Sequence, residues 1–196
     1  MTGVTAEPID PAAGSWSPDP IRQRLAGYTL DDILAVPDDA PRVELVDGVM
    51  GVVPSPTFGH QSIGFLLCGW LRAHCPPQLT ASIALGVAVD ANNSCEPDVL
   101  LHRADTALDR HFLLPSDVTI VVEIVSPSTR RRDRMEKPAV YADAGIPYFW
   151  RIEQNPVRVH AYQLADGTYR EQATSTDELV LNEPFPLRLS IAAITP

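Results

Sequence analysis

The chain has 196 residues, a hydrophobic fraction of 45% and a net charge of −10, with a pI of about 4.8. Its length suits one domain or one domain plus a tail, and its apolar content is sufficient for a sizeable core. The acidic balance argues against a protein coated in positive potential for non-specific nucleic-acid binding, but it does not exclude a small basic groove.

The N-terminal segment is rich in proline and in small or acidic residues, which is typical of a loosely attached chain. We expect a flexible tail over residues 1–24, with order beginning near Tyr28. The segment has neither the basic start nor the apolar stretch of a secretion signal.

Cysteine usage and hydropathy favour a cytoplasmic protein. Cys68, Cys75 and Cys95 form no metal-ligand pattern, and an odd number without a secretion signal indicates reduced thiols. The longest apolar helical run, residues 63–71, is too short to span a bilayer, so we expect no membrane partner.

The first predicted elements are a short helix and a hairpin. Thr29 and Asp32 form an N-cap pair before a helix that ends at Pro37. Two apolar runs within residues 42–53 flank Asp47-Gly48, which is a strong hairpin signal.

The remaining elements follow from the spacing of apolar residues and turn signals. We expect helices at 57–74 and 137–144, and strands at 81–89, 97–101, 119–125, 146–152, 157–164, 169–173, 179–181 and 187–191. This order predicts a mixed α/β sandwich around a central sheet.

One acidic residue, Glu123, stands in the almost continuously apolar run 119–125. Such a run predicts a strand buried on both faces, where an unpartnered carboxylate is costly. We therefore expect Glu123 to meet a cation or a metal ion, or to stay protonated. A structural salt bridge to one of the arginines at 130–134 is the alternative.

A second acid, Asp98, starts the predicted strand 97–101, and 123 − 98 = 25 residues separate it from Glu123. That separation allows one loop and a return into a neighbouring strand. Two carboxylates on adjacent strands can hold one hard divalent ion such as Mg²⁺. A strand-start cap is the alternative role of Asp98.

Lys137 is the single lysine of the chain, beside fourteen arginines. Arginine replaces lysine poorly where a compact ammonium must sit against a water or a phosphate oxygen. A lysine in a chain that otherwise uses arginine therefore favours a functional position, and chance placement is the alternative.

Several motifs together resemble the Uma-type family of putative restriction endonucleases, within the PD-(D/E)XK nuclease superfamily. In chain order they are VELVDG (43–48), His60 opening a helix, EPDV (96–99), VVEIVSPST (121–129), Asp133, Lys137, Tyr141 and AGIPYFWRIE (144–153). The resemblance covers roughly residues 28–160. It implies a restriction-endonuclease-like α/β fold, with a mixed central β-sheet flanked by helices, in a single endonuclease-like domain over 25–196.

The resemblance implies a catalytic metal centre. It assigns Asp98 and Glu123 as metal ligands, with the Ile124 carbonyl as a further ligand. The implied cofactor is Mg²⁺ or Mn²⁺, which would polarise the phosphate and lower the pKa of a bound water.

The resemblance also implies two further catalytic residues. The superfamily places its lysine two residues after the strand acid, where this chain has Val125, but some branches carry it on the following helix. Lys137 then becomes the migrated lysine, which positions the attacking water and offsets developing charge. Glu44 resembles the family's upstream acid, with an exposed hairpin charge as the alternative.

Possible substrate contacts surround these residues. His60 matches the family's histidine and either contacts the site or fixes the start of its helix. The hydroxyls of Ser126, Ser128 and Thr129 could donate to a phosphate, although turn hydrogen bonding is commoner. A dense basic run could draw a polyanion to the cleft, or could be a solvated loop; it comprises Arg130, Arg131, Arg132 and Arg134.

The combined hypothesis is a metal-dependent nuclease that acts on nucleic acid, expected to be DNA, as a homodimer. The residues themselves do not distinguish DNA from RNA. A nuclease-fold module that binds nucleic acid or protein without cutting is the main alternative, and a carboxylate-pair hydrolase of another substrate is a weaker one. A nucleotide-binding enzyme would need a glycine-rich phosphate loop, which the sequence lacks.

Overall fold

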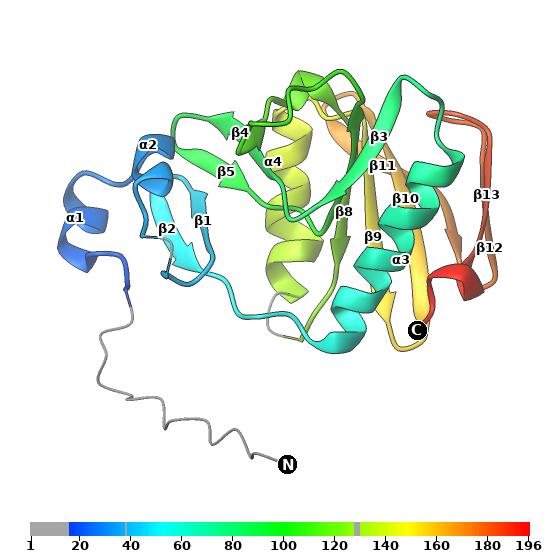
Figure 1. The fold of residues 1–196 in the computed structure, drawn as a ribbon, viewed down its shortest axis with the longest axis horizontal. Coiled ribbons are helices and arrows are strands. Elements are labelled where there is room, and N and C mark those ends of the chain that lie inside the picture. The colour runs from blue at the N-terminus through cyan, green and yellow to red at the C-terminus, as the bar shows by residue number, and fades with distance from the viewer. Residues whose placement is uncertain (1–15, 38, 128–129) are drawn as a thin grey trace, which may run out of the picture.

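The computed structural model describes residues 16–37, 39–127 and 130–196 (Figure 1). Its α-helices are α1 (Pro20–Leu25), α2 (Leu30–Leu34), α3 (Phe58–His74) and α4 (Lys137–Asp143), and shorter helical turns are η1 (Pro115–Asp117), η2 (Arg132–Glu136) and η3 (Ile191–Ile194). Its strands are β1 (Val43–Val46), β2 (Val49–Val52), β3 (Leu79–Ile83), β4 (Gly86–Asp90), β5 (Asn93–Cys95), β6 (Val99–Arg103), β7 (Phe112–Leu113), β8 (Val118–Ile124), β9 (Tyr148–Gln154), β10 (Val157–Ala165), β11 (Thr168–Ser175), β12 (Glu178–Leu181) and β13 (Leu187–Ser190).

A six-stranded mixed sheet in the order β11-β10-β9-β8-β6-β3 forms the centre of the molecule. Only β8 and β9 run parallel within it; its other neighbouring pairs are antiparallel. The predicted mixed α/β architecture with a central sheet flanked by helices is therefore confirmed.

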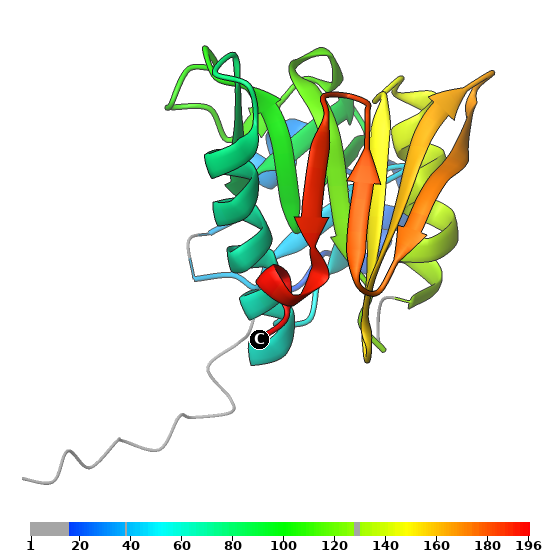
Figure 2. The same cartoon turned by 90° about the vertical axis from the view of Figure 1, so that its right-hand side faces the viewer.

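The two faces of this sheet are covered by different elements. On β8, Ile120 and Val122 pack into the core beneath α3 and the β12–β13 hairpin, and Figure 2 shows that hairpin in front of the sheet, next to α3. Val121 points the other way and packs with Tyr141 of α4. Because side chains alternate along a strand, Glu123 shares the α4 face with Val121.

A smaller sheet in the order β2-β1-β5-β4-β7 lies beside the large one. The predicted hairpin is confirmed: β1 and β2 pair antiparallel across Asp47 and Gly48, which both have positive φ, as a type I′ turn requires. Leu45 is fully buried in a local core, and its neighbour Glu44 consequently points from the opposite face of β1.

The helix predictions are confirmed near their expected bounds. Thr29 and Asp32 form a capping box at the start of α2, and the Thr57 side chain caps α3 by accepting from the His60 backbone N–H. Among the residues that the structure describes, no helix has both the length and the apolar character needed to cross a membrane.

Two sequence predictions require correction. The strand expected at 81–89 is two strands, β3 and β4, which belong to different sheets. Ala84 takes a left-handed conformation (φ 50°) at the break, a conformation that alanine rarely adopts, so the apolar run hides the turn. Order also begins before Tyr28, because α1 lies within the expected tail and is capped by Asp19; residues 1–15 of that tail are outside the described residues.

Candidate active site

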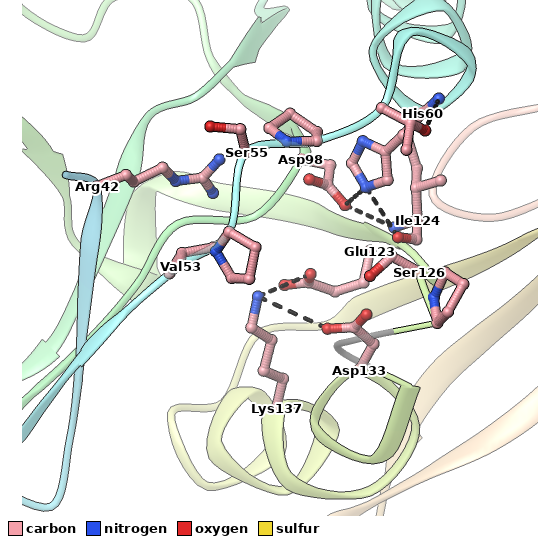
Figure 3. Close-up of a pocket in the computed structure, with 14 residues that line it drawn as sticks. Arg42, Val53, Ser55, His60, Asp98, Glu123, Ile124, Ser126, Asp133 and Lys137 are labelled. Atoms are coloured by element: carbon pink, nitrogen blue, oxygen red, sulfur yellow. Dashed lines mark hydrogen bonds and ion pairs between the residues drawn. The ribbon is translucent and has the colours of Figure 1, made fainter. Parts of the chain in front are cut away.

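A pocket of about 240 Å³ lies where the β1–β2 hairpin, the start of α3, the end of β8 and the segment η2–α4 meet. Figure 3 shows its polar walls: Asp98, Glu123 and Asp133 contribute carboxylates, and Lys137 points its ammonium toward them. The pocket therefore brings together acids from three separate parts of the chain and its single lysine.

Register places the two principal acids side by side. Val99 of β6 pairs with Val122 of β8, so the next position along this ladder sets Asp98 opposite Glu123. Directly opposed residues have Cβ atoms roughly 4.5–5.5 Å apart and side chains on one face. The backbone supports this placement, because the Asp98 N–H donates to the Val122 carbonyl at 3.0 Å.

Lys137 is buried among three carboxylates. Its Nζ lies 2.9 Å from Glu123 Oε2, 3.0 Å from Glu44 Oε1 and 3.9 Å from Asp133 Oδ1. Burial alone would lower the pKa of Lys137, but the three acids raise it above its usual value, so the ammonium keeps its proton. The alternative salt bridge of Glu123 to an arginine of the basic run is not the contact found.

Glu123 is held from both sides. Lys137 donates to its Oε2, and the Tyr141 hydroxyl donates to its Oε1 at 2.6 Å. Burial is the main cause that raises the pKa of Glu123 to about 8; Lys137 opposes the rise, and neighbouring carboxylates add to it. The cluster therefore retains a proton at neutral pH.

The helical segment that presents these partners is irregular. Within η2, a π-helical turn, the Lys137 N–H donates to the carbonyl of Arg132, five residues earlier. The ring of Pro138 would press on the carbonyl four residues before it in a regular helix, and the wider turn accommodates it. Asp133, Lys137 and Tyr141 then follow at intervals of four and line one helix face.

Glu44 is a buried member of the cluster rather than an exposed hairpin charge, with 2% of its surface exposed. Although burial opposes it, Lys137 and Arg132 together hold the pKa of Glu44 below its usual value. Arg132 forms a short ion pair with Glu44. The small sheet is thereby tied electrostatically to η2 and α4.

His60 bridges two of the proposed metal ligands. Its Nε2 lies 2.9 Å from the Ile124 carbonyl oxygen and 3.3 Å from Asp98 Oδ2, as Figure 3 shows. Burial would lower the pKa of His60, but Asp98 and the Ile124 carbonyl raise it, which favours the protonated imidazole between these oxygens. Asp98 Oδ2 also accepts from the Ile124 N–H at 2.7 Å.

The remaining predicted residues are dispersed. Ser126 lines the pocket, whereas Thr129 lies outside the described residues. Arg130 and Arg131 are exposed on the approach to η2, and Arg131 pairs with Glu136. Of the basic run, Arg132 turns inward to the buried cluster.

Sequence reasoning missed three contributors. Asp133 and Tyr141 were noted only as motif residues, although their spacing of four on either side of Lys137 is the signal that could have placed them on one helix face. Arg42 had no signal at all; it lines the pocket through its packing against Glu96, whose Oε1 lies 3.1 Å from its Nε.

Comparisons with known proteins agree with this architecture. The family model Uma2, described as "Putative restriction endonuclease", matches residues 16–194. A solved structure of a putative nuclease belonging to DUF820 from Anabaena variabilis superposes with a TM-score of 0.67 at 21% identity, and the match covers 85% of this chain and 97% of that one. This likeness confirms the expected fold. No curated protein matches the chain.

Proposed function

The chain belongs to the Uma2 family, whose description is "Putative restriction endonuclease", and from this premise we propose that it hydrolyses phosphodiester bonds of nucleic acid, expected to be DNA, with a divalent metal ion. The observation that best supports this proposal is the buried ammonium of Lys137, which lies 2.9 Å from Glu123 in a pocket that also contains Asp98.

The donor set of the pocket fits a hard divalent ion. Asp98, Glu123 and the Ile124 carbonyl offer oxygen atoms, which Mg²⁺ and Mn²⁺ prefer. The His60 imidazole partners the Ile124 and Asp98 oxygens, so it lies where the ion would bind. A bound ion would supply charge that stabilises the phosphate and lowers the pKa of water.

The chain's own residues have distinct proposed roles. Lys137 orients the attacking water and offsets negative charge that develops on the phosphate. Glu44 and Tyr141 fix the Lys137–Glu123 pair from either side, because they contact its ammonium and its carboxylate respectively. A compact ammonium fits this space, whereas the planar guanidinium of arginine is larger and differently shaped.

We propose that several residues in and beside the pocket contact the substrate. His60 and Ser126 line the pocket. Arg130 and Arg131 lie directly before η2, where their exposed guanidinium groups would attract a polyanion despite the acidic body. Thr129, outside the described residues, stays a predicted contact. Arg132, which pairs with Glu44, would act through that carboxylate.

A second candidate function is a non-cutting module that binds nucleic acid or protein. It is favoured by one observation: both carboxylate oxygens of Glu123, a proposed metal ligand, already accept hydrogen bonds, from Lys137 and from Tyr141. Calorimetric titration with Mg²⁺ and Mn²⁺ distinguishes the two, because a nuclease binds the ion through Asp98 and a non-cutting module need not. Homodimerisation and a cytoplasmic location stay predictions.

A plasmid-nicking assay with Mg²⁺ or Mn²⁺ tests the nuclease proposal. We expect Asp98→Ala and Glu123→Ala to abolish metal-dependent nicking, and Lys137→Arg to slow it roughly a hundredfold or more. The surface substitution Arg170→Lys, at a side chain 66% exposed, serves as the control and should leave the rate unchanged. Full activity of Lys137→Arg would contradict the role of Lys137, and wild-type inactivity with both ions would contradict the function.

A further inference from the structure

A second cavity adjoins the candidate active site. Its volume is about 470 Å³, within the usual range for sites that bind small organic groups. The two cavities share the residues Arg42, Pro56, His60, Asp98 and Ile124. A ligand group in the second cavity would therefore be directly connected to one in the catalytic pocket.

The outer wall of the second cavity combines an exposed aromatic ring with polar groups. Phe65 of α3 is 70% exposed, and Ile83 at the end of β3 is 49% exposed. Gln61, one helical turn before Phe65, and Glu96 line the same cavity. Flat apolar surface with polar groups beside it matches a nucleobase, which has apolar faces and hydrogen-bonding edges.

Gly64 leaves the helix side of this cavity open. Glycine in a helix interior is destabilising relative to alanine, yet Gly64 lies in the interior of α3. A Cβ at this position would lie 3.5 Å from the nearest atom, the Ile124 Cδ1, which is ordinary contact. Packing therefore does not require glycine here, and a longer side chain would occupy the cavity.

We propose that this second cavity is a base pocket, which receives one unstacked nucleobase of the strand whose phosphate enters the catalytic pocket. The inference rests on the proposed nuclease function and deepens it. Arg42 places a cation at the junction of the two cavities, held by Glu96, where the connecting sugar-phosphate would lie. Because a base inside a duplex is stacked and paired, the favoured substrate is single-stranded or locally unpaired nucleic acid.

Binding of two matched oligonucleotides tests the base pocket. One is a fluorescein-labelled single-stranded DNA 12-mer of thymidine, and the other is a 12-mer of abasic sites with the same phosphates. With Ca²⁺ in place of Mg²⁺ and at fixed salt, we expect the protein to bind the thymidine strand at least about fivefold more tightly. Phe65→Ala and Gly64→Leu should remove this preference.

Phe58→Ala is the matched control, because Phe58 lies on the same helix, is 83% exposed and lines neither cavity. It should keep the preference. Equal binding of both strands by the wild type, or an unchanged preference in Phe65→Ala, would overturn the base pocket. A drop in molecular mass of Phe65→Ala in light scattering would also overturn it, since the face would then be a contact between copies of the chain.

The binding and cleavage experiments together distinguish failure of the base pocket from failure of the proposed nuclease function. Metal-dependent nicking that needs Asp98, together with equal binding of both strands, would refute the base pocket and support the nuclease. A base preference that depends on Phe65, in a protein that cuts neither the plasmid nor single-stranded DNA with Mg²⁺ or Mn²⁺, would support the pocket and refute the nuclease. Binding of neither strand would refute both.

Discussion

Replacing Lys137 with methionine removes the ammonium but keeps a flexible side chain in the buried cluster. The Nζ atom lies 3.0 Å from Glu44 and 2.9 Å from Glu123, whose side chains are only 1% and 2% exposed. The pKa of Glu123 is already raised in the wild type. Removing the ammonium of Lys137 therefore changes the ionisation of Glu44 more than that of Glu123. Full protonation of Glu44 at pH 7, against its ordinary pKa of 4.5, would cost about 1.36 × 2.5, or about 3.4 kcal/mol, and the remaining partner Arg132 makes this an upper limit. We expect the unfolding free energy to fall by about 3 kcal/mol at pH 7, as for other broken buried pairs.

The direction of the pH dependence follows from proton binding. In the wild type, the folded state keeps Glu44 ionised, because Lys137 and Arg132 lower its pKa. In the variant, Arg132 alone still faces the buried Glu44 carboxylate, so the pKa of folded Glu44 rises above its wild-type value. The variant therefore loses stability relative to the wild type as the pH rises above 4.5, by at most about 1.36 kcal/mol per pH unit. Urea unfolding at pH 5, 6 and 7 measures this difference, which should be clearly smaller at pH 5 than at pH 7.

A matched substitution controls for the loss of a long cationic side chain. Arg134 pairs with Glu153 at 2.8 Å, but these side chains are 40% and 24% exposed. Arg134→Met should therefore cost less than about 1 kcal/mol. The reasoning would be refuted if Lys137→Met cost no more than Arg134→Met at pH 7, or if its cost were the same at pH 5 and pH 7.

Four further predictions concern buried groups and two glycines. Tyr141→Phe removes a donor from buried Glu123 and should lower the unfolding free energy by about 1–3 kcal/mol in urea titration; an unchanged midpoint would contradict the importance of this bond. Gly69→Ala, where a Cβ meets nothing within 4 Å, should stabilise α3 by about 0.5–1 kcal/mol. Gly86→Ala should instead lower the melting temperature, because its Cβ would lie 2.4 Å from an aromatic ring atom. A higher melting temperature for Gly86→Ala than for Gly69→Ala would contradict both predictions. Burial raises the pKa of Cys95 to about 12, so iodoacetamide at pH 8 should modify it only after unfolding, and rapid labelling seen by mass spectrometry would argue against this.

Local patterns were sufficient to predict the central features of the site. An acid inside an apolar strand needs a partner, and this rule anticipated that Glu123 would meet a cation. The placement of Lys137 beside the acids was expected from the family resemblance, and the strand period explains why Glu123 shares the α4 face with Val121. These inferences succeed because each depends on a few adjacent residues.

Features that depend on distant packing were not predictable in the same way. The burial of Glu44 requires the hairpin to dock against η2, and a four-residue strand with one charge gives no sign of that contact. The π-helical turn before Pro138 results from one backbone hydrogen bond that slips by a residue. The break at Ala84 lies within a continuous apolar run, where alternation gives no warning.

The cluster around Lys137 also sets an order for biosynthesis. Glu44 and Lys137 are 137 − 44 = 93 residues apart in the chain, yet their charged atoms lie 3.0 Å apart. A ribosome-bound chain must therefore emerge as far as α4 before its acids and its ammonium can meet. If the protein is a nuclease, an incomplete or truncated polypeptide that ends before α4 cannot cut the nucleic acid of the cell that makes it, because no fragment of it contains the whole site.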